Sequence, residues 1–301
     1  MGSTMAQEAL KHRLRASGFA VEEIAASAGG VIATAGVANL LGGQQVFAKT
    51  LPDAAADGIF TVEAEGLTAL RELGGARTPQ VLAATADLLV LEAMRPRDDG
   101  EAFWEALGRM VAGLHTATVN DRFGWHREGW LGRLRQENSW DINGYRFFAE
   151  RRILRWLREP LVQEAFDRED RRALERLCEA LPELVPPSPP VLTHGDLWSG
   201  NVLADPAGGG GPVLIDPAVS YTWAEVDVSM MWCGLRPPAA ERFFDAYADV
   251  AGLEPGWRER MPILFLRELL SQIAHGDGDW GAAAAVRETI SPFRSSAPTG
   301  R

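Results

Sequence analysis

The sequence predicts an α+β protein with two lobes: a small β-rich lobe with one main helix, then a larger, mainly helical lobe. Short apolar runs separated by glycine-rich turns fill residues 28–94, and apolar residues at helical spacing dominate after residue 100. A chain of 301 residues is also long enough for two domains or one large two-lobed unit. The first lobe is therefore expected over residues 1–94 and the second over residues 95–301.

In the first lobe we expect about five short strands and one helix. The runs with strand character are residues 29–39, 45–50, 80–84 and 88–91. Gly42-Gly43 lies between the first two runs, which favours a β-hairpin. Asp57 to Leu73 has apolar residues at i, i+3/i+4 and i+7 and predicts a helix that Gly74-Gly75 ends. Residues 5–17 and 20–27 are interpreted as short helical or loop segments.

In the second lobe, apolar spacing predicts helices around residues 103–114, 153–157 and 174–181. Five prolines lie between Pro182 and Pro190, too many for a helix, and lead into a short apolar strand at Val191-Leu192. Two further strands are expected at residues 202–203 and 213–215 around a glycine-rich turn. Residues 225–293 are predicted to be mostly helical.

Composition excludes several classes of function. The net charge is −11, so no basic surface for nucleic acid is expected. No run of 18 apolar residues predicts a membrane span, and the first 15 residues lack the apolar core of a signal peptide. Cys178 and Cys233 do not form a metal site of known spacing; one disulfide stays open, but two thiols in a long chain favour a reducing cytoplasm. Nothing in the sequence specifies an oligomeric state.

The most informative segment is the loop His194-Gly-Asp-Leu-Trp-Ser-Gly-Asn201. It places Asp196 and Asn201 five positions apart after a strand, and Asp216 follows at the end of the strand over residues 213–216. This arrangement is typical of kinase-type phosphotransferases, which hold a nucleophilic hydroxyl and Mg-ATP. Asp196 is predicted to be the catalytic base that accepts or orients the hydroxyl proton. Asn201 and Asp216 supply the hard oxygen ligands that Mg²⁺ prefers.

A purely structural interpretation stands beside this one. His-Gly-Asp can be a turn in which Asp196 and Asn201 make local hydrogen bonds. The strands on both sides and the second acidic residue at a strand end favour the catalytic interpretation. We expect His194 to be a scaffold residue that bonds the loop backbone.

Lys49 ends the run Val46-Phe-Ala-Lys, which resembles the strand that places a lysine on the phosphates of ATP. The alternative is a solvated strand lysine. The chain has only one other lysine and uses arginine elsewhere, which favours a function at this position. Glu63 and Glu65 are both candidate partners on the following helix. They lie two positions apart and cannot share one helix face, so only one is expected to pair with Lys49.

Two further segments are candidates for ATP binding. The turn from Gly29 and Gly30 to Gly36 is expected to cover the phosphates with backbone N–H groups, although it does not match Gly-x-Gly-x-x-Gly. Glu92 and Met94 end the last strand of the first lobe. Backbone groups there are predicted to pair with adenine while Met94 packs on its face; the alternative is an ordinary strand end.

Leu192-Thr-His-Gly-Asp-Leu-Trp-Ser-Gly-Asn-Val202 followed by Ile215-Asp-Pro-Ala218 resembles the fructosamine kinase (ketosamine 3-kinase) family. Other segments in the family's order extend the resemblance to roughly residues 28–275. It implies a protein-kinase-like fold related to aminoglycoside and choline phosphotransferases, and ATP-dependent phosphorylation of the 3-hydroxyl of a ketosamine. It also favours Glu63 over Glu65, because Glu63 fills the acidic place of the Phe-x-x-Glu segment.

The resemblance also implies residues on the acceptor side. Trp198 is expected to be a platform for the sugar ring or its amine, against the alternative of core packing under the loop. His275 is a candidate substrate residue against a plain helix-end histidine. Glu225 and Asp227 are interpreted as charges that hold the loop. The apolar run after Gly30 and the segment after Ala218 depart from the family pattern, which leaves the natural acceptor open.

Three functions are therefore compared. The first is a small-molecule ketosamine kinase, acting on a fructosamine or ribulosamine with ATP and Mg²⁺. The second uses the same chemistry on an aminoglycoside, another amino-sugar or an amino-alcohol. The third is a nucleotide-binding pseudo-enzyme, which the presence of Lys49 and all the acidic candidates disfavours.

Overall fold

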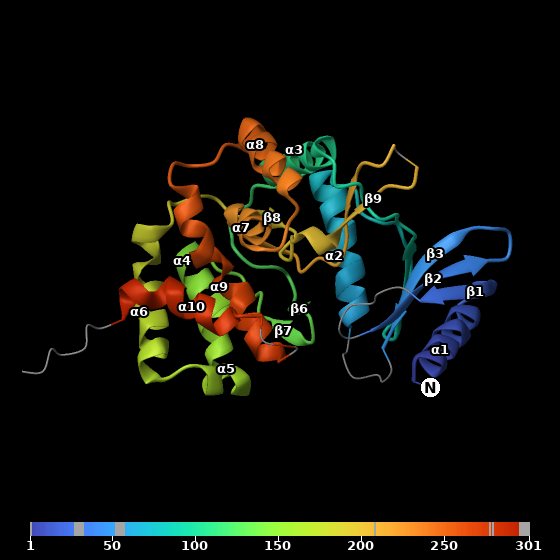
Figure 1. Ribbon diagram of the computed structural model, residues 1–301, viewed down its shortest axis with the longest axis horizontal. Helices are drawn as coiled ribbons and strands as arrows, with labels where there is room; N and C mark the ends of the chain where they lie inside the picture. The colour runs from blue at the N-terminus through green and yellow to red at the C-terminus, as the bar shows by residue number, and fades with distance from the viewer. Residues whose placement is uncertain are drawn as a thin grey trace, which may run out of the picture. The chain divides into compact units, whose positions relative to one another are not determined.

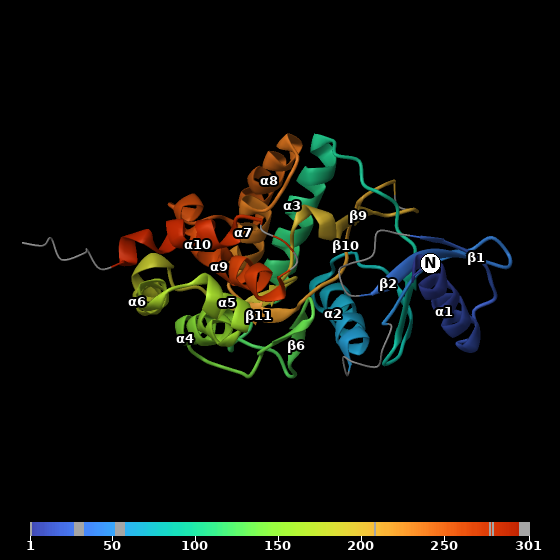
Figure 2. The same ribbon diagram turned by 60° about the horizontal axis from the view of Figure 1, so that its bottom comes forward.

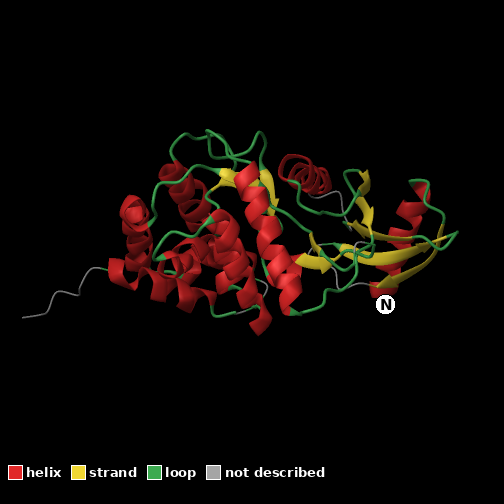
Figure 3. Ribbon diagram, turned by 90° about the horizontal axis from the view of Figure 1, so that it is seen from above, coloured by secondary structure: helices red, strands yellow, loops and turns green. Residues whose placement is uncertain are grey.

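The computed structural model describes residues 2–26, 33–51, 58–207, 209–276, 278 and 280–294. The fold is α+β, as predicted, and the chain forms two compact units (Figures 1 and 3). Each unit is assembled from three stretches of sequence. The first unit comprises Met1–Ala117, Ser199–Ala218 and Pro237–Ala251, and the second comprises Thr118–Trp198, Val219–Arg236 and Gly252–Arg301.

The elements of the first unit are α1 Gly2–Ala16, β1 Val21–Ala26, β2 Thr34–Leu40, β3 Gln45–Thr50, α2 Ile59–Gly74, β4 Val81–Ala84, β5 Leu88–Glu92, α3 Glu101–Ala117, the 3-10 turn η3 Ser199–Asn201, β9 Val202–Ala204, β10 Pro212–Leu214, the turn η4 Pro238–Ala240 and α8 Glu241–Ala251. Those of the second are β6 Gly129–Leu131, β7 Leu134–Gln136, α4 Gly144–Phe148, the π-helical turn η1 Ala149–Ile153, the 3-10 turn η2 Leu154–Arg158, α5 Pro160–Ala165, α6 Arg168–Leu184, β8 Val191–Thr193, β11 Ser220–Thr222, α7 Glu225–Cys233, α9 Trp257–His275, α10 Ala282–Ile290 and the turn η5 Ser291–Phe293.

The first unit contains a five-stranded antiparallel sheet in the order β1-β2-β3-β5-β4. Successive residues of a strand point to opposite faces, and β5 buries both faces. Leu88 and Val90 pack in a cluster with Leu10 and Leu14 of α1, whereas Leu89 and Leu91 pack in a second cluster with α2. The sheet therefore lies between the two helices.

The same alternation sets the direction of Lys49. On β3, Val46 and Ala48 belong to the α1 cluster, and Phe47 packs against the α2 cluster. Lys49 is two residues beyond Phe47 and thus shares its face of the sheet. A strand-end lysine is in this way aimed at α2, the helix on which its acidic partner was predicted.

Most predicted elements of this unit are confirmed, with two corrections, at residues 20–27 and at Gly36. The hairpin of β2 and β3, the helix α2 and the strands β4 and β5 lie where the sequence placed them. Residues 20–27 are not helix or loop throughout, because Val21–Ala26 forms the edge strand β1. Its pairing with β2 is a long-range interaction that residue periodicity does not contain. Gly29 and Gly30 lie outside the described residues, but Gly36, where the predicted phosphate-covering turn ends, is part of strand β2 and pairs with Ala48 of β3.

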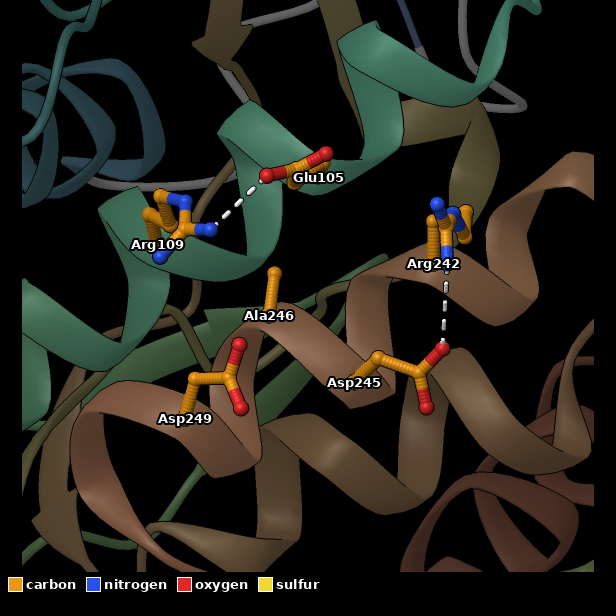
Figure 4. A pocket seen from close by; sticks show the side chains of 6 residues that line it. All are labelled: Glu105, Arg109, Arg242, Asp245, Ala246 and Asp249. Atoms are coloured by element: carbon orange, nitrogen blue, oxygen red, sulfur yellow. Dashed lines mark hydrogen bonds and ion pairs between the residues drawn. The ribbon is translucent and has the colours of Figure 1, made fainter.

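Helices α3 and α8 pack side by side within the first unit (Figure 2). Gly108 allows the close approach: a Cβ atom there would lie 2.3 Å from the carbonyl oxygen of Phe243. The outer rim of this contact is charged, with ion pairs from Arg109 to Glu105 at 2.7 Å and from Arg242 to Asp245 at 3.8 Å (Figure 4).

The second unit is mainly helical and carries the loop motif. Strand β8, which leads into His194, pairs antiparallel with β11, and α7 packs against α9. Two expectations need correction here. Helix α6 continues through Pro182 to Leu184, and the helix expected around residues 153–157 is the π-helical turn η1 followed by the 3-10 turn η2. In that irregular stretch the carbonyl of Arg152 accepts a hydrogen bond from Trp156 Nε1 at 3.0 Å.

The compact units do not divide at residue 94. Helix α3 and residues 199–218 group with the first unit because they are bonded to it: Arg95 exchanges both backbone hydrogen bonds with Ala204, and Leu214 N donates to the carbonyl of Arg77. The predicted boundary at residue 94 marks where strand-like runs give way to helical spacing in the sequence. The compact units are defined instead by which segments pair in the folded chain. None of the described helices is long and apolar enough to cross a membrane.

Candidate active site

Lys49 joins two carboxylates in the first unit. Its Nζ atom lies 2.7 Å from Oε1 of Glu63 and 2.6 Å from Oδ1 of Asp216. The side chains of Lys49 and Glu63 are nearly buried, whereas that of Asp216 is 41% exposed. Three residues separated by up to 167 positions thus form one cluster, and Glu63, not Glu65, is the carboxylate on Lys49.

The charges in this cluster are unequal, because two carboxylates share one ammonium group. Burial opposes the charge on Lys49, but Asp216 and Glu63 outweigh it and raise the pKa of Lys49. For Glu63, burial is the largest influence; together with the repulsion from Asp216 it exceeds the attraction of Lys49 and raises the pKa to about 8. Asp216 is the more exposed of the two carboxylates.

The backbone brings Asn201 next to Asp216. Strands β9 and β10 pair antiparallel, with Val202 opposite Leu214, and Ile215 N donates to the carbonyl of Asn201 at 3.1 Å. Asp216 has φ 52°, a left-handed conformation found at no other described non-glycine residue. Such conformations are costly and collect at functional sites. Asp216 lies two positions after the end of β10, and Asn201 lies one position before the start of β9, the strand that pairs with β10.

This oxygen set fits Mg²⁺ bound with a nucleotide. Asp216 offers an accessible carboxylate and the neighbouring Asn201 a neutral amide, both hard ligands. Within the described ranges, no three His, Cys, Asp or Glu side chains gather into a metal cluster. A Mg²⁺ ion normally takes one or two protein oxygens and completes its shell with phosphate and water, so two ligands beside Lys49 suffice.

The loop that carries Asp196 is held in the second unit by Asp227. The carboxylate of Asp227 on α7 accepts hydrogen bonds from His194 N at 2.7 Å and from Gly195 N at 2.9 Å. His194 is fully buried, and its Nδ1 atom accepts from Asp196 N at 3.2 Å. The expectation of a scaffold histidine is therefore confirmed, as is the loop-holding role of Asp227. Glu225 instead binds Arg260.

The model of the fructosamine kinase family matches residues 3–288 of the sequence. The chain belongs to the fructosamine kinase family. A relative from Enterococcus faecium described as a probable ketoamine kinase is 33% identical over 72% of this chain and 76% of its own length. The match spans both units, so this kinase is an ATP-dependent phosphotransferase with the kinase-like fold that the loop motif predicted.

Solved structures agree with this assignment. A crystal structure described as a putative fructosamine-3-kinase from Thermobifida fusca has a TM-score of 0.82 and 32% identity, and covers 94% of this chain and 96% of its own. An aminoglycoside phosphotransferase in ternary complex with ADP and hygromycin B has a TM-score of 0.63 and 16% identity, and covers 94% of this chain and 97% of its own. The second likeness concerns the fold alone.

Trp198 is not a core residue. Trp198 is 41% exposed, and its backbone N–H donates to the carbonyl of Asp196 at 3.1 Å. A Cβ atom on Gly234 would lie 3.7 Å from that of Trp198, so the start of the side chain borders the end of α7. The alternative of packing under the loop does not describe this half-exposed indole.

Other candidate residues are engaged in structural interactions. The side chain of Glu92 binds Arg77 through both oxygens, at 2.7 and 3.0 Å, and Arg77 also reaches Asp205 at 2.6 Å. The hydrogen bond from Arg77 is the main reason that the pKa of Glu92 is lowered. The side chain of Glu92 is therefore occupied, and its backbone N–H donates to the carbonyl of Gln80 at 2.9 Å, so the pairing of adenine with this strand end stays a prediction. Sequence reasoning missed Arg77, whose only local signal is an arginine just before Thr78-Pro79.

His275 has both ring nitrogens in hydrogen bonds. Its Nε2 accepts from Arg133 N at 3.0 Å, and its Nδ1 lies 2.7 Å from the carbonyl of Ser271 one turn earlier on α9. This is the geometry of a histidine that ends a helix and holds the turn between β6 and β7. The imidazole is fully used without a substrate, so we leave it out of the proposed acceptor site.

Proposed function

We propose that this kinase transfers the γ-phosphate of MgATP to the 3-hydroxyl of a ketosamine, a fructosamine or a ribulosamine. The observation that carries the proposal is the cluster of Lys49, Glu63 and Asp216 beside Asn201. A buried lysine fixed by a helix carboxylate, next to an exposed Asp and an Asn, is the set of groups that grips a metal–triphosphate. Family membership supports the ketosamine as acceptor.

Each residue has a defined role in this reaction. Lys49 binds phosphate oxygens, and Glu63 holds the ammonium group in place. Asn201 and Asp216 hold Mg²⁺, which when bound neutralises charge on the phosphates. Asp196 orients the acceptor hydroxyl and takes its proton as the new P–O bond forms and ADP departs. The sequence places Asp196 only five positions before Asn201. Trp198, two positions after Asp196, offers an aromatic face to the sugar or its amine.

The alternative acceptor class is an aminoglycoside or amino-alcohol, because one fold with the same transfer chemistry can serve different acceptors. Two free thiols, Cys178 and Cys233, support a reducing, cytoplasmic setting for either reaction.

An ATP-consumption screen over fructosamines, ribulosamines, aminoglycosides and choline-like alcohols tests the proposal. We expect turnover with ketosamines and its loss by orders of magnitude in Asp196→Asn, while nucleotide binding measured by calorimetry survives. Turnover only with aminoglycosides or amino-alcohols selects the alternative. Near-normal turnover in Asp196→Asn removes Asp196 from its role, and no turnover with any acceptor favours a pseudo-enzyme.

A further inference from the structure

The loop 194–201 is held through two of its backbone carbonyls by two arginines. Arg267 on α9 donates one N–H to the carbonyl of Gly195 at 2.5 Å and another to Oε1 of Gln136 at 2.6 Å. Both Arg267 and Gln136 are 3% exposed. The guanidinium therefore lies in a buried site in the second unit and is hydrogen-bonded to Gly195, the residue just before Asp196.

Arg97 plays the matching part in the first unit. It donates from Nη1 to the carbonyl of Ser199 at 2.7 Å and to that of Val202 at 3.2 Å. Its guanidinium also lies 5.2 Å from the ring centroid of Trp104, which is fully buried, and its Nε donates to Asp99 at 2.8 Å. The two carbonyls that Arg97 holds flank Asn201 on either side.

We propose that Arg267 and Arg97 are positioning residues for phosphoryl transfer, with Arg267 setting Asp196 and Arg97 setting Asn201. The proposal rests on the function proposed above. Each arginine holds a carbonyl within two residues of its target and belongs to the same compact unit as that carbonyl. Hydrogen bonds from a charged donor are about twice as strong as neutral ones, and a planar fork can serve two acceptors at once.

Electrostatics support the assignment of Arg267. Burial lowers its pKa, and the carboxylates that act in the opposite direction are Glu268, Asp196 and Asp227. A buried cation that is attracted to Asp196, and bonded to its neighbour, restricts where the carboxylate can lie. Small displacements are expensive in catalysis, since about 1 Å costs on the order of 100-fold in rate.

The Arg267 half is tested with Arg267→Lys, because lysine keeps the charge but does not form the same two-pronged bond. We expect kcat with MgATP and a ketosamine that the wild-type enzyme turns over to fall about 10- to 100-fold, with KM for ATP changed less than about twofold. The matched control is Arg260→Lys on the same helix. Arg260 is also buried but binds both carboxylate oxygens of Glu225, so this variant loses a two-pronged bond without touching the loop. Equal kcat values in the two variants overturn the assignment.

The Arg97 half predicts a different defect. Arg97→Lys is expected to raise the Mg²⁺ concentration needed for half-maximal nucleotide binding by about tenfold, the effect of losing a hydrogen bond to a charged donor. Calorimetry at several Mg²⁺ concentrations measures this without catalysis. The control is Arg109→Lys, an exposed arginine on α3 paired with Glu105. If Arg97→Lys and the control need the same Mg²⁺ concentration for half-maximal nucleotide binding, the positioning role of Arg97 is overturned.

A second variant covers the case in which Arg267→Lys does not fold. Gln136→Met removes the other acceptor and frees the guanidinium to move from Gly195, so we expect a smaller fall in kcat with KM for ATP unchanged; wild-type kcat overturns the assignment.

Asp196→Asn separates this inference from the proposed function. If Asp196→Asn is inactive while Arg267→Lys and Arg97→Lys behave like their controls, only the positioning roles fail. If Asp196→Asn stays active, Asp196 loses its proposed role and Arg267 its target, whereas a wild-type enzyme that turns over no ketosamine contradicts the proposed function itself.

Discussion

At the ammonium group of Lys49, two carboxylates compete for one positive charge. The buried Glu63 holds the lysine on the face of the sheet toward α2, and the exposed Asp216 keeps a carboxylate oriented toward solvent. In the proposed function, phosphates add negative charge next to a lysine whose own pKa is already raised by its partners. Asp216 is then the group of the three best placed to take up a cation, because it combines exposure with a fixed backbone.

The first prediction concerns Asp216. Asp216→Ala removes the only carboxylate among the proposed metal ligands, so Mg²⁺ should no longer strengthen ATP binding. We expect a loss of at least about tenfold in affinity with Mg²⁺ present and little change without it, since a hydrogen-bonded or ligated charge contributes about 1.5–3 kcal/mol. Calorimetric titration with and without Mg²⁺ measures both quantities. Unchanged Mg²⁺-dependent binding contradicts the metal role.

The second prediction concerns Trp198. Trp198→Ala should raise KM for the sugar acceptor about 3- to 30-fold and KM for ATP much less, as expected for an aromatic face that contacts a polar or cationic ligand. Trp198→Phe should recover most of the affinity because it keeps a ring. Trp280→Ala is the control, since Trp280 is also exposed (73%). An acceptor KM that does not respond to Trp198→Ala excludes the platform role.

At the scale of elements, close packing of α3 and α8 builds part of the first unit. Gly108 on α3 lies against the backbone of Phe243 on α8, and the nearby hydrogen bond between the Tyr247 hydroxyl and His115 Nδ1, at 2.8 Å, also joins the two helices. A side chain at position 108 would force the helices apart, because the nearest atom is a backbone carbonyl oxygen that cannot rotate away.

The third prediction follows from this contact. Gly108→Ala should lower the free energy of unfolding by about 1–3 kcal/mol, the usual cost of overpacking. Gly113→Ala is a matched control on the same helix, because a Cβ atom there meets nothing within 4 Å. It should be neutral or stabilising by roughly 0.5–1 kcal/mol, since alanine replaces glycine inside a helix. Urea unfolding of both variants decides, and equal stability contradicts the packing argument.

At the scale of the whole molecule, acid stability is expected to depend on Asp141 in the second unit. Its side chain is 2% exposed and accepts two hydrogen bonds from Arg146, at 2.7 and 2.8 Å. The bond from Arg146 is the main cause that lowers the pKa of Asp141 below its ordinary 3.8. Because the pKa of Asp141 is lower in the folded state than in the unfolded state, the ionised carboxylate stabilises the fold at any pH above the unfolded-state pKa. This stabilisation is lost as the pH falls through the folded-state pKa.

The fourth prediction is that Asp141→Asn is less stable than the wild type at pH 5–7, and that the difference shrinks below about pH 4. Urea midpoints measured from pH 3 to pH 7 give the difference. Asp121→Asn is the control, because Asp121 is 84% exposed and only 3.6 Å from its neighbour Arg122. A stability difference for Asp141→Asn that persists unchanged into acid contradicts the ion-pair explanation.

Local sequence was sufficient for the elements with strong periodicity and for the residues inside the loop motif. The helix from Ile59, the strand from Leu88 and the Asp-x4-Asn spacing are all properties of short segments, and α2, β5 and the loop follow them. The edge strand β1 and the irregular turns η1 and η2 were not predicted correctly. Their backbones are determined by pairing with β2 and by side-chain bonds such as that of Trp156, which neighbouring residues do not encode.

The family resemblance favoured Glu63 as the partner of Lys49, and the structure confirms this pairing. The carbonyls held by Arg97 and Arg267 depended on tertiary structure. Arg97 and Ser199 lie 102 positions apart, and Gly195 and Arg267 lie 72 apart. Arg267 lies among apolar residues of a helix, and nothing in the neighbouring sequence distinguishes it from any other partly buried arginine. Composition and motif thus determine a kinase of the fructosamine kinase family, because phosphoryl transfer needs few groups at fixed short spacing. The folded chain alone decides which distant cations hold that spacing in place, because only packing brings them to the loop.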